Sequence, residues 1–420
     1  MASEVTRRGG FLADLRGVLG PGPLRLLFLA RAISVFGDML VPVALAFGVL
    51  QLTGSPSALG FLLAARAVPS LLFLLHGGVA GDRYSPKAVM VIAQGTAAGA
   101  QIALGALMVS GVKNVALLCL LMAIRGSTSA FFNPSSTSAI ASVTDPSSRN
   151  AAFSLFATIG AVSEVLGPAA AGIGLLITAP GWILILDGLT FVVSASLIAA
   201  TPSLQRRANT AHPGGTIRSE IMEGLAFVYK TPWLASLNIS AALFQFVVLS
   251  SLTVLGPLVA ERSLGGPTGW AIIASATGLG AVLGGVMGAR LKPQRPLAVA
   301  CGVATLAAGP TLVLLSFPAP VWAIAISEFA SGASVTLFGV LVTTTVANHV
   351  PSELLSRVDS VNRLASTALR PVGMAIIAPV ASLVGLRPML LLAAAIGCTA
   401  MVAPLLLGSV RNLRLDPPLV

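Results

Sequence analysis

Charged residues are scarce in this sequence. Asp, Glu, Lys and Arg make up 9% of the 420 residues, against 55% hydrophobic residues, and the mean hydropathy is +0.93. Soluble domains carry about 25% charged residues, so the composition excludes an ordinary soluble domain. The apolar residues form continuous runs of bilayer-spanning length rather than the alternating pattern of a β-barrel. We therefore expect an all-α membrane protein with many spans.

Cysteine, histidine and nucleotide-binding motifs are also few or missing. The three cysteines lie inside apolar runs without a pairing pattern, and we interpret them as packing residues. The three histidines show no metal-ligand spacing, and no phosphate-binding Gly-x-x-x-x-Gly-Lys-Ser/Thr loop occurs. We expect no enzymatic activity, no metal and no cofactor, with a proton gradient as the energy source.

Twelve apolar runs divide into two sets of six. The first set lies within residues 24–201 and the second within 233–408, so we expect a six-helix bundle from each. Between them, residues 202–232 form a polar linker with Ile217, Ile221, Leu225 and Val228 at helical spacing, which predicts an amphipathic helix. A basic segment at 1–23 and a tail at 409–420 complete the predicted layout.

The distribution of basic residues predicts the orientation. Of the 25 Lys and Arg, eighteen fall in the two termini and the even-numbered loops, three fall in the odd-numbered loops, and four lie inside spans. Cytoplasmic loops carry the excess of Lys and Arg, so both termini are expected in the cytoplasm. This bias accounts for the net charge of +11 without a nucleic-acid partner.

A glycine-rich turn with charged residues follows the second run. It contains Gly78, Asp82, Arg83 and Lys87, and a degenerate copy at 284–292, without the acid, follows the eighth run. The spacing Gly-x-x-x-Asp-Arg-x-x-x-Lys at this position resembles the signature loop of the major facilitator superfamily. That resemblance implies twelve transmembrane helices in two pseudo-repeats, a monomer, and transport of a small molecule by alternating access.

A second motif, in the fifth run, narrows the resemblance. Gly167, Pro168 and Gly172 match the Gly-Pro-x-x-Gly-Gly pattern of exporters in this family, with Ala171 in place of one glycine. The bacterial subgroup that exports drugs, antibiotics and siderophore-like molecules is the most similar. We therefore expect a proton-coupled exporter of an amphipathic molecule in a bacterial cytoplasmic membrane. An importer, a uniporter, or a lipid or lysophospholipid translocator of the same fold remain alternatives.

The same resemblance assigns a latch and a seam. The signature loop would contact the start of the eleventh span and hold the cytoplasmic side closed; its alternative role is only to anchor topology. The latch residues are Gly78, Asp82, Arg83, Lys87, Arg290, Asp359 and Arg363. A row of glycines at 280, 284 and 288 lies on one face of the eighth span. We expect this row, with the fifth span, to form the smooth seam between the halves, with generic helix packing as the alternative.

Eight ionisable residues lie inside spans, where each charge costs about 2.5–3.5 kcal/mol at the bilayer centre. They are Arg31, Asp38, Arg66, Arg125, Glu164, Asp187, Glu328 and Arg370. All except Glu164 and Asp187 are predicted to line the substrate cavity, with Phe244, Phe246 and Phe338 as apolar contacts or, alternatively, core residues. The resemblance implies that Asp38, near Arg125, is the proton-coupling acid and Glu164 a second one. Buried ion pairs that only hold helices together are the alternative, and Asp187 is interpreted as structural.

Overall fold

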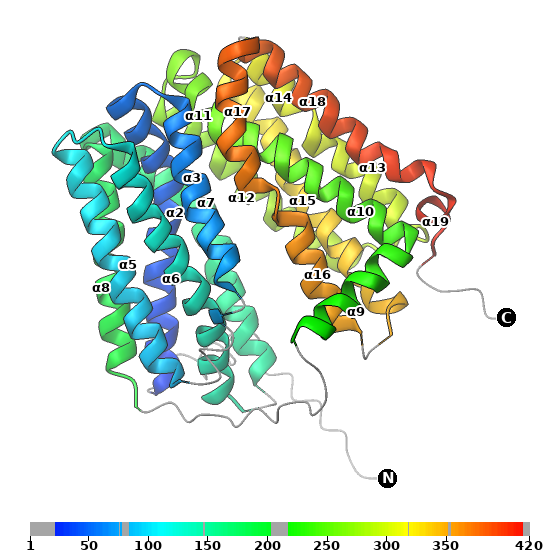
Figure 1. Ribbon diagram of the computed structural model, residues 1–420, viewed down its shortest axis with the longest axis horizontal. Coiled ribbons are helices and arrows are strands. Elements are labelled where there is room, and N and C mark those ends of the chain that lie inside the picture. The colour runs from blue at the N-terminus through cyan, green and yellow to red at the C-terminus, as the bar shows by residue number, and fades with distance from the viewer. Residues whose placement is uncertain are drawn as a thin grey trace.

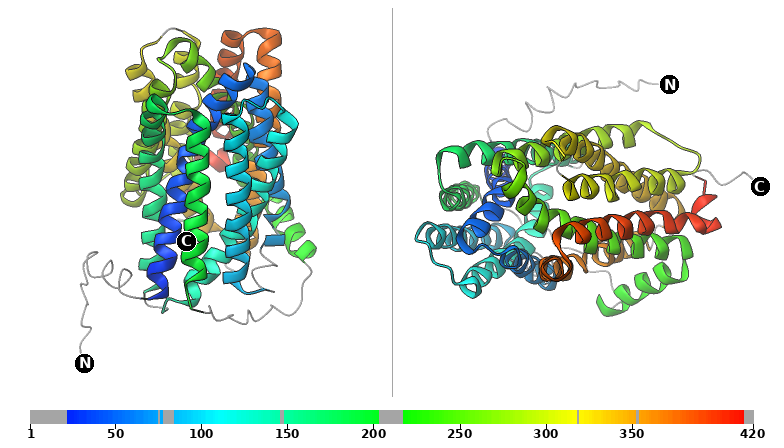
Figure 2. Two further views of the ribbon diagram at one scale, coloured as in Figure 1. Left: turned by 90° about the vertical axis from the view of Figure 1, so that its left-hand side faces the viewer. Right: turned by 90° about the horizontal axis from the view of Figure 1, so that it is seen from above.

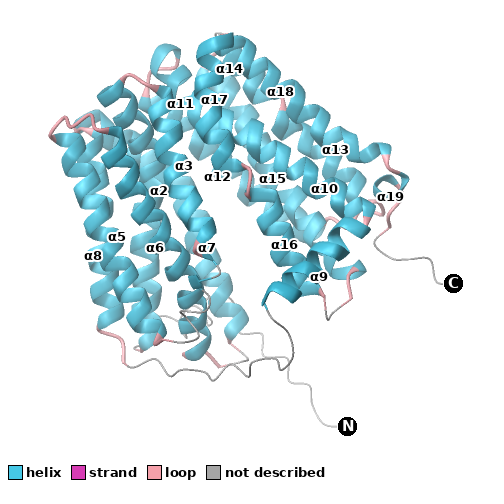
Figure 3. Ribbon diagram, viewed as in Figure 1, coloured by secondary structure: helices cyan, strands magenta, loops and turns pink. Residues whose placement is uncertain are grey.

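The computed structural model describes residues 22–74, 76–77, 84–145, 148–202, 217–317, 319–351 and 354–414. The described part is helical, with short loops and no strand (Figure 3). The N-terminal half consists of α2 (Pro23–Thr53), α3 (Pro56–Leu72), α5 (Pro86–Val109), α6 (Val115–Ser142), α7 (Arg149–Ile177) and α8 (Pro180–Ala199). These six helices form one bundle (Figure 1).

The C-terminal half repeats this plan with three interrupted spans. After the linker helix α9 (Ile217–Lys230), the seventh span joins α10 (Pro232–Leu243), the π-helix η1 (Phe244–Leu249) and α11 (Ser250–Ser263). Then come α12 (Pro267–Arg290), α13 (Pro296–Ala308) with α14 (Pro310–Ser316), α15 (Val321–His349), α16 (Leu355–Thr367) with α17 (Arg370–Val384), and α18 (Leu386–Val402). The short elements η2 (Ala403–Leu406) and α19 (Gly408–Arg411) follow.

The count of spans agrees with the prediction. Eleven helical segments of the described residues are long and apolar enough to cross a membrane, and Pro56–Leu72 is a shorter apolar helix between two of them. The expected all-α architecture of twelve membrane helices in two six-helix bundles is therefore confirmed. Seen from above, the two bundles lie side by side (Figure 2).

Local sequence signals set the helix ends. Eight of the described helices begin with a proline, whose missing N–H costs nothing in the first turn. Ser55 and Asn114 cap α3 and α6 by accepting a hydrogen bond from the backbone N–H three residues on. Gly54 ends α2 with a φ of 66°, a left-handed conformation that glycine adopts without strain.

The bundles meet at one end of the molecule and diverge at the other. We call the end that holds Pro23, Ala199 and α9 the linker face, and the opposite end the far face. Contacts between the bundles join α7 to α12, α3 to α17, and α11 to both α2 and α3. Towards the linker face the two sets of helices diverge (Figure 1).

The expected glycine seam is partly wrong. The fifth and eighth spans, α7 and α12, do pack across the two halves. The row Gly280, Gly284 and Gly288, however, faces α15 inside the C-terminal bundle, where an added Cβ at Gly284 would lie 2.2 Å from the Ala333 carbonyl oxygen. Close approaches between the halves occur instead at Gly172, where a Cβ would lie 2.4 Å from the Cβ of Ala271, and at Gly60, where a Cβ would lie 2.1 Å from the Met374 carbonyl oxygen.

The linker helix packs on the C-terminal bundle. Leu225 and Val228 join an apolar cluster with Trp233 and Val358, and the exposed Glu223 forms an ion pair with Arg357 of α16. The chain is therefore helical in the second half of the predicted linker, whereas residues 203–216 lie outside the described part.

Candidate functional site

A cavity of about 710 Å³ lies between the two bundles. Seven of the eight membrane-embedded ionisable residues line it, and only Asp187 does not. Those seven are Arg31, Asp38, Arg66, Arg125, Glu164, Glu328 and Arg370. Apolar side chains from both halves, including Leu59 and Trp270, close it towards the far face. The cavity is therefore a shared chamber, polar on several walls.

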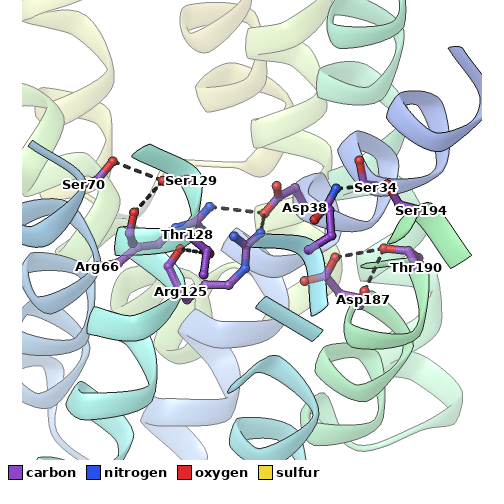
Figure 4. Close-up of polar contacts among 12 residues, drawn as sticks. Ser34, Asp38, Arg66, Ser70, Arg125, Thr128, Ser129, Asp187, Thr190 and Ser194 are labelled. Atoms are coloured by element: carbon purple, nitrogen blue, oxygen red, sulfur yellow. Dashed lines mark hydrogen bonds and ion pairs between the residues drawn. The ribbon is translucent and has the colours of Figure 1, made fainter. Parts of the chain in front are cut away.

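Asp38 is the centre of the charged group. Its Oδ1 accepts a hydrogen bond from Arg125 Nη2 at 2.6 Å and from Arg66 Nη2 at 3.2 Å. Figure 4 shows the two guanidinium groups directed at Asp38 from α6 and α3. The Asp38 side chain keeps 26% of its surface exposed, so the carboxylate is accessible from the cavity while paired to two cations.

Arg125 is held more firmly than Arg66. Its side chain is only 5% exposed, and its guanidinium lies 4.1 Å from the centroid of the Phe191 ring, a cation–π contact. The Arg66 side chain is 30% exposed and has no such ring contact among the described residues. Of the two cations on Asp38, Arg66 is therefore the one that can move into the cavity at lower cost.

Asp187 belongs to this group although its position on the sixth span argued for a structural role. It is fully buried on α8 and close enough to Asp38, Arg66 and Arg125 to interact with them electrostatically. Its Oδ1 accepts a hydrogen bond from Thr190, and its Oδ2 has no hydrogen-bond partner among the described residues. Gly37 creates the space, since a Cβ there would lie 2.5 Å from Asp187 Oδ1.

Arg31 lies nearer the linker face. Its guanidinium donates to Asn133 Oδ1 at 3.4 Å and lies 5.5 Å from the Phe132 ring centroid. Because Asn133 and Phe132 are on α6, Arg31 connects α2 to α6 at a position closer to the linker face than Asp38. Sequence reasoning did not single out Asn133 as its partner, since a neutral amide in a membrane helix carries no charge signal.

The wall from the C-terminal bundle is built differently. Glu328 is 2% exposed; its Oε2 accepts a hydrogen bond from Thr277 at 2.8 Å, and its Oε1 has no partner in the described part of the chain. Arg370, the first residue of α17, has a buried Nε that is likewise unpaired among those residues. Glu164 lines the cavity from α7 and is exposed. It forms no ion pair with another described residue.

The three predicted phenylalanine contacts lie elsewhere. Phe244 and Phe338 line a second pocket inside the C-terminal bundle. Phe246 packs against the apolar core, with its carbonyl oxygen 2.1 Å from a Cβ built on Gly373. None of the three is among the described residues that line the central cavity.

The predicted latch is only partly described. Gly78, Asp82 and Arg83 lie outside the described residues, as does the side chain of Arg363. Lys87 donates to the Thr201 carbonyl oxygen at 2.5 Å, which joins the start of α5 to the end of α8 within one bundle. Arg290 is exposed at the end of α12, and Asp359 lines the second pocket.

The three residues of the exporter-type motif on α7 contact different parts of the molecule. An added Cβ at Gly167 would lie 2.3 Å from Met39 Cβ, so this glycine lets α2 and α7 approach each other. Pro168 lines the central cavity. Gly172 makes the tight contact with Ala271 across the two bundles. The motif therefore combines packing within one half, the cavity wall and the seam.

Chemically, the site suits reversible binding of a charged or polar guest. It offers an accessible carboxylate that holds two cations, a buried neighbouring acid, and unpaired polar atoms on the facing wall. Among the described residues, no group of three or more His, Cys, Asp or Glu is arranged to hold a metal ion.

Comparisons with known proteins agree with this architecture. Residues 27–374 match the family model of the Major Facilitator Superfamily. The chain is 28% identical over 412 residues to the Multidrug efflux pump Tap of Mycobacterium tuberculosis, covering 94% of this chain and 96% of that protein. It is 27% identical to the Tap pump of Mycolicibacterium fortuitum, covering 88% and 94%.

A solved structure supports the fold independently. The nucleoside transporter NupG superposes with a TM-score of 0.72 at 12% identity, covering 91% of this chain and 98% of NupG. At that identity the likeness concerns the fold alone. Together with the family match over most of the chain, it shows that the protein belongs to the major facilitator superfamily of secondary membrane transporters and is not an enzyme.

Proposed function

We propose that this transporter exports an amphipathic organic molecule from a bacterial cytoplasm in exchange for protons, with Asp38 as the proton-carrying group. The observation that carries the proposal is the placement of Asp38, paired with Arg66 and Arg125, in the wall of the chamber between the halves. The similarity to Tap, a named multidrug efflux pump, over 94% of the chain supports export of drug-like molecules.

Protonation of Asp38 would change the charge of the chamber. With Asp38 ionised, its charge offsets part of the charge of Arg66 and Arg125; with Asp38 neutral, both cations lose their closest counter-charge. Asp187, with its unpaired Oδ2, is positioned to take over part of that interaction. A cationic guest that binds the protonated Asp38 would displace its proton, and reprotonation of Asp38 would release the guest; Glu164 offers a second exposed acid on the same wall.

The predicted orientation assigns the two faces of the molecule to the two sides of the membrane. The basic residues gather in the termini and even-numbered loops, so the linker face is assigned to the cytoplasm. The bundles contact near the far face and diverge towards the linker face (Figure 1). The conformation is therefore assigned as inward-facing, with the chamber accessible to cytoplasmic substrate, and Arg31, Arg370 and Glu328 as further polar contacts.

The test measures proton release on binding. Ethidium is added to purified wild-type protein and to Asp38→Asn in weak buffer, and the pH change is recorded. We expect release from the wild type and none from Asp38→Asn. Glu261→Gln, which removes an exposed acid outside the chamber lining, serves as the matched control and should behave as the wild type. Unchanged release from Asp38→Asn would remove Asp38 from the mechanism.

Direction and substrate class are tested in vesicles. Inside-out vesicles with an acidic interior should accumulate ethidium if the protein is an exporter. An importer would accumulate ethidium only in right-side-out vesicles. Translocation of a fluorescent lysophospholipid in proteoliposomes, without any ethidium transport, would instead identify a lipid translocator.

A further inference from the structure

A second pocket lies inside the C-terminal bundle and has no place in the mechanism above. Its volume is about 410 Å³, and it is lined by α10, η1, α13, α15, α16 and α18. None of its lining residues lines the central cavity. The volume falls within the range of about 300–1,000 Å³ that small-molecule sites occupy.

The lining has an apolar part and a polar part. Phe244, Phe338 and Met401 supply aromatic and sulfur-containing surface, which suits a flat apolar body. Asn238 Nδ2 donates to Asn362 Oδ1 at 2.6 Å, and both residues line the pocket. A few fixed polar groups in an otherwise apolar cavity are the usual composition of a ligand site.

Gln245 supplies an observation that points to a ligand directly. Its Oε1 is buried and has no hydrogen-bond partner among the described residues, although the side chain lines the pocket. Buried amide oxygens are normally hydrogen-bonded. Gln245 belongs to the π-helical turn η1, a rare geometry that occurs often at functional sites. Because this oxygen has almost no accessible surface, a guest with an N–H or O–H group would satisfy the acceptor once the amide turns towards the pocket.

We propose that this pocket is a second ligand-binding site, for a molecule with a planar apolar body and a hydrogen-bond-donating amine or hydroxyl group. The body packs against Phe244 and Phe338, and the donor binds Gln245 Oε1. Because the two cavities share no lining residue, this site and the central chamber can be occupied together. The inference does not depend on proton exchange or on the direction of transport.

Gly339 provides a selective block. It lines the pocket, and a Cβ built on it meets no atom within 4 Å. Gly339→Leu therefore adds side-chain volume to the pocket at a position where the Cβ itself meets no clash. Gly302→Leu is the matched control, because Gly302 also lies in a helix of the same bundle with open space around its Cβ but lines neither this pocket nor the central cavity.

Ethidium, a planar cation with aromatic amines, is the probe, and equilibrium dialysis against the purified full chain gives the number of molecules bound. We expect two per chain for the wild type and Gly302→Leu, and one for Gly339→Leu. Asp38→Asn should retain binding in the second pocket, so a failure of the proposed exchange mechanism would leave this result intact. Identical binding by Gly339→Leu and Gly302→Leu would overturn the proposal.

The donor assignment has its own test. Gln245→Leu removes the acceptor and keeps the volume, so ethidium affinity at this site should fall about three- to tenfold. N-Methylacridinium, a planar aromatic cation without a hydrogen-bond donor, should bind this variant as it binds the wild type. An equal loss for both probes, or no loss for ethidium, would contradict the role of Gln245.

Discussion

A single methyl group at Gly172 should shift the conformational equilibrium of this transporter. The Cβ of Gly172→Ala would lie 2.4 Å from the Cβ of Ala271, whereas carbon atoms pack at about 3.5–4.0 Å. The two helices, α7 and α12, must therefore separate by roughly 1 Å at the far face. Overpacking of this kind costs about 1–3 kcal/mol, which corresponds to a roughly 5- to 150-fold change in an equilibrium constant.

The penalty applies only to the state in which the far face is closed, so the variant should favour the state in which the linker face is closed. Spin labels at Asn150 and Tyr229, exposed residues of α7 and α9, report this by double electron–electron resonance. The labels are placed in a background without the native cysteines. We expect a larger population of short distances between the labels in Gly172→Ala than in the parent protein.

Two further variants isolate the seam as the cause. Gly160→Ala on the same helix meets no atom within 4 Å and should leave the distances unchanged. Ala271→Gly, added to Gly172→Ala, removes the close partner and leaves Pro267 O at 3.6 Å as the nearest atom. The double variant should therefore return to the parent distribution. A folded Gly172→Ala with unchanged distances, or a shift that Ala271→Gly does not reverse, would refute the reasoning.

Two other substitutions test the packing within the N-terminal bundle. Gly37→Ala places a Cβ 2.3 Å from Thr190 Oγ1, so thermal unfolding should show that the free energy of unfolding falls by about 1–3 kcal/mol. Gly95→Ala, whose Cβ meets no atom within 4 Å, should leave the free energy of unfolding unchanged. Lys87→Met removes the donor to the Thr201 carbonyl and should lower the free energy of unfolding by about 1–2 kcal/mol. Lys87→Arg, which retains a donor, should recover most of that loss in the same measurement.

The overall fold was predictable because its strongest signals are local. The length of each apolar run reflects the thickness of a bilayer, and prolines mark the start of eight of the described helices. The membrane-embedded charges were also informative, since a charge in lipid needs a partner or water. Seven of the eight do line one chamber.

The arrangement of helix faces was not predictable in the same way. Helical spacing shows that Gly280, Gly284 and Gly288 share a face, but not which neighbour that face contacts, and the partner is α15. Phe244 and Phe338 line the second pocket for a related reason, since an aromatic residue in a span does not reveal which side of its helix faces the cavity. The place of Asp187 depends on Gly37, a pairing between distant residues that a single sequence does not reveal.

The two walls of the chamber differ in whether their polar groups have ion-pair or hydrogen-bond partners. This difference indicates different roles for the two halves. On the N-terminal wall, Asp38 is already paired with Arg66 and Arg125, so its simplest change is the gain or loss of a proton. On the C-terminal wall, Glu328 and Arg370 each keep a buried atom without a hydrogen-bond partner among the described residues. Such atoms are costly unless water or a ligand contacts them. Under the proposed function, we therefore infer that the C-terminal half adds contacts to the guest, while Asp38 in the N-terminal half exchanges the guest for a proton. The tight seam at Gly172 would then couple the two, because neither wall can turn towards the opposite face of the membrane while that contact persists.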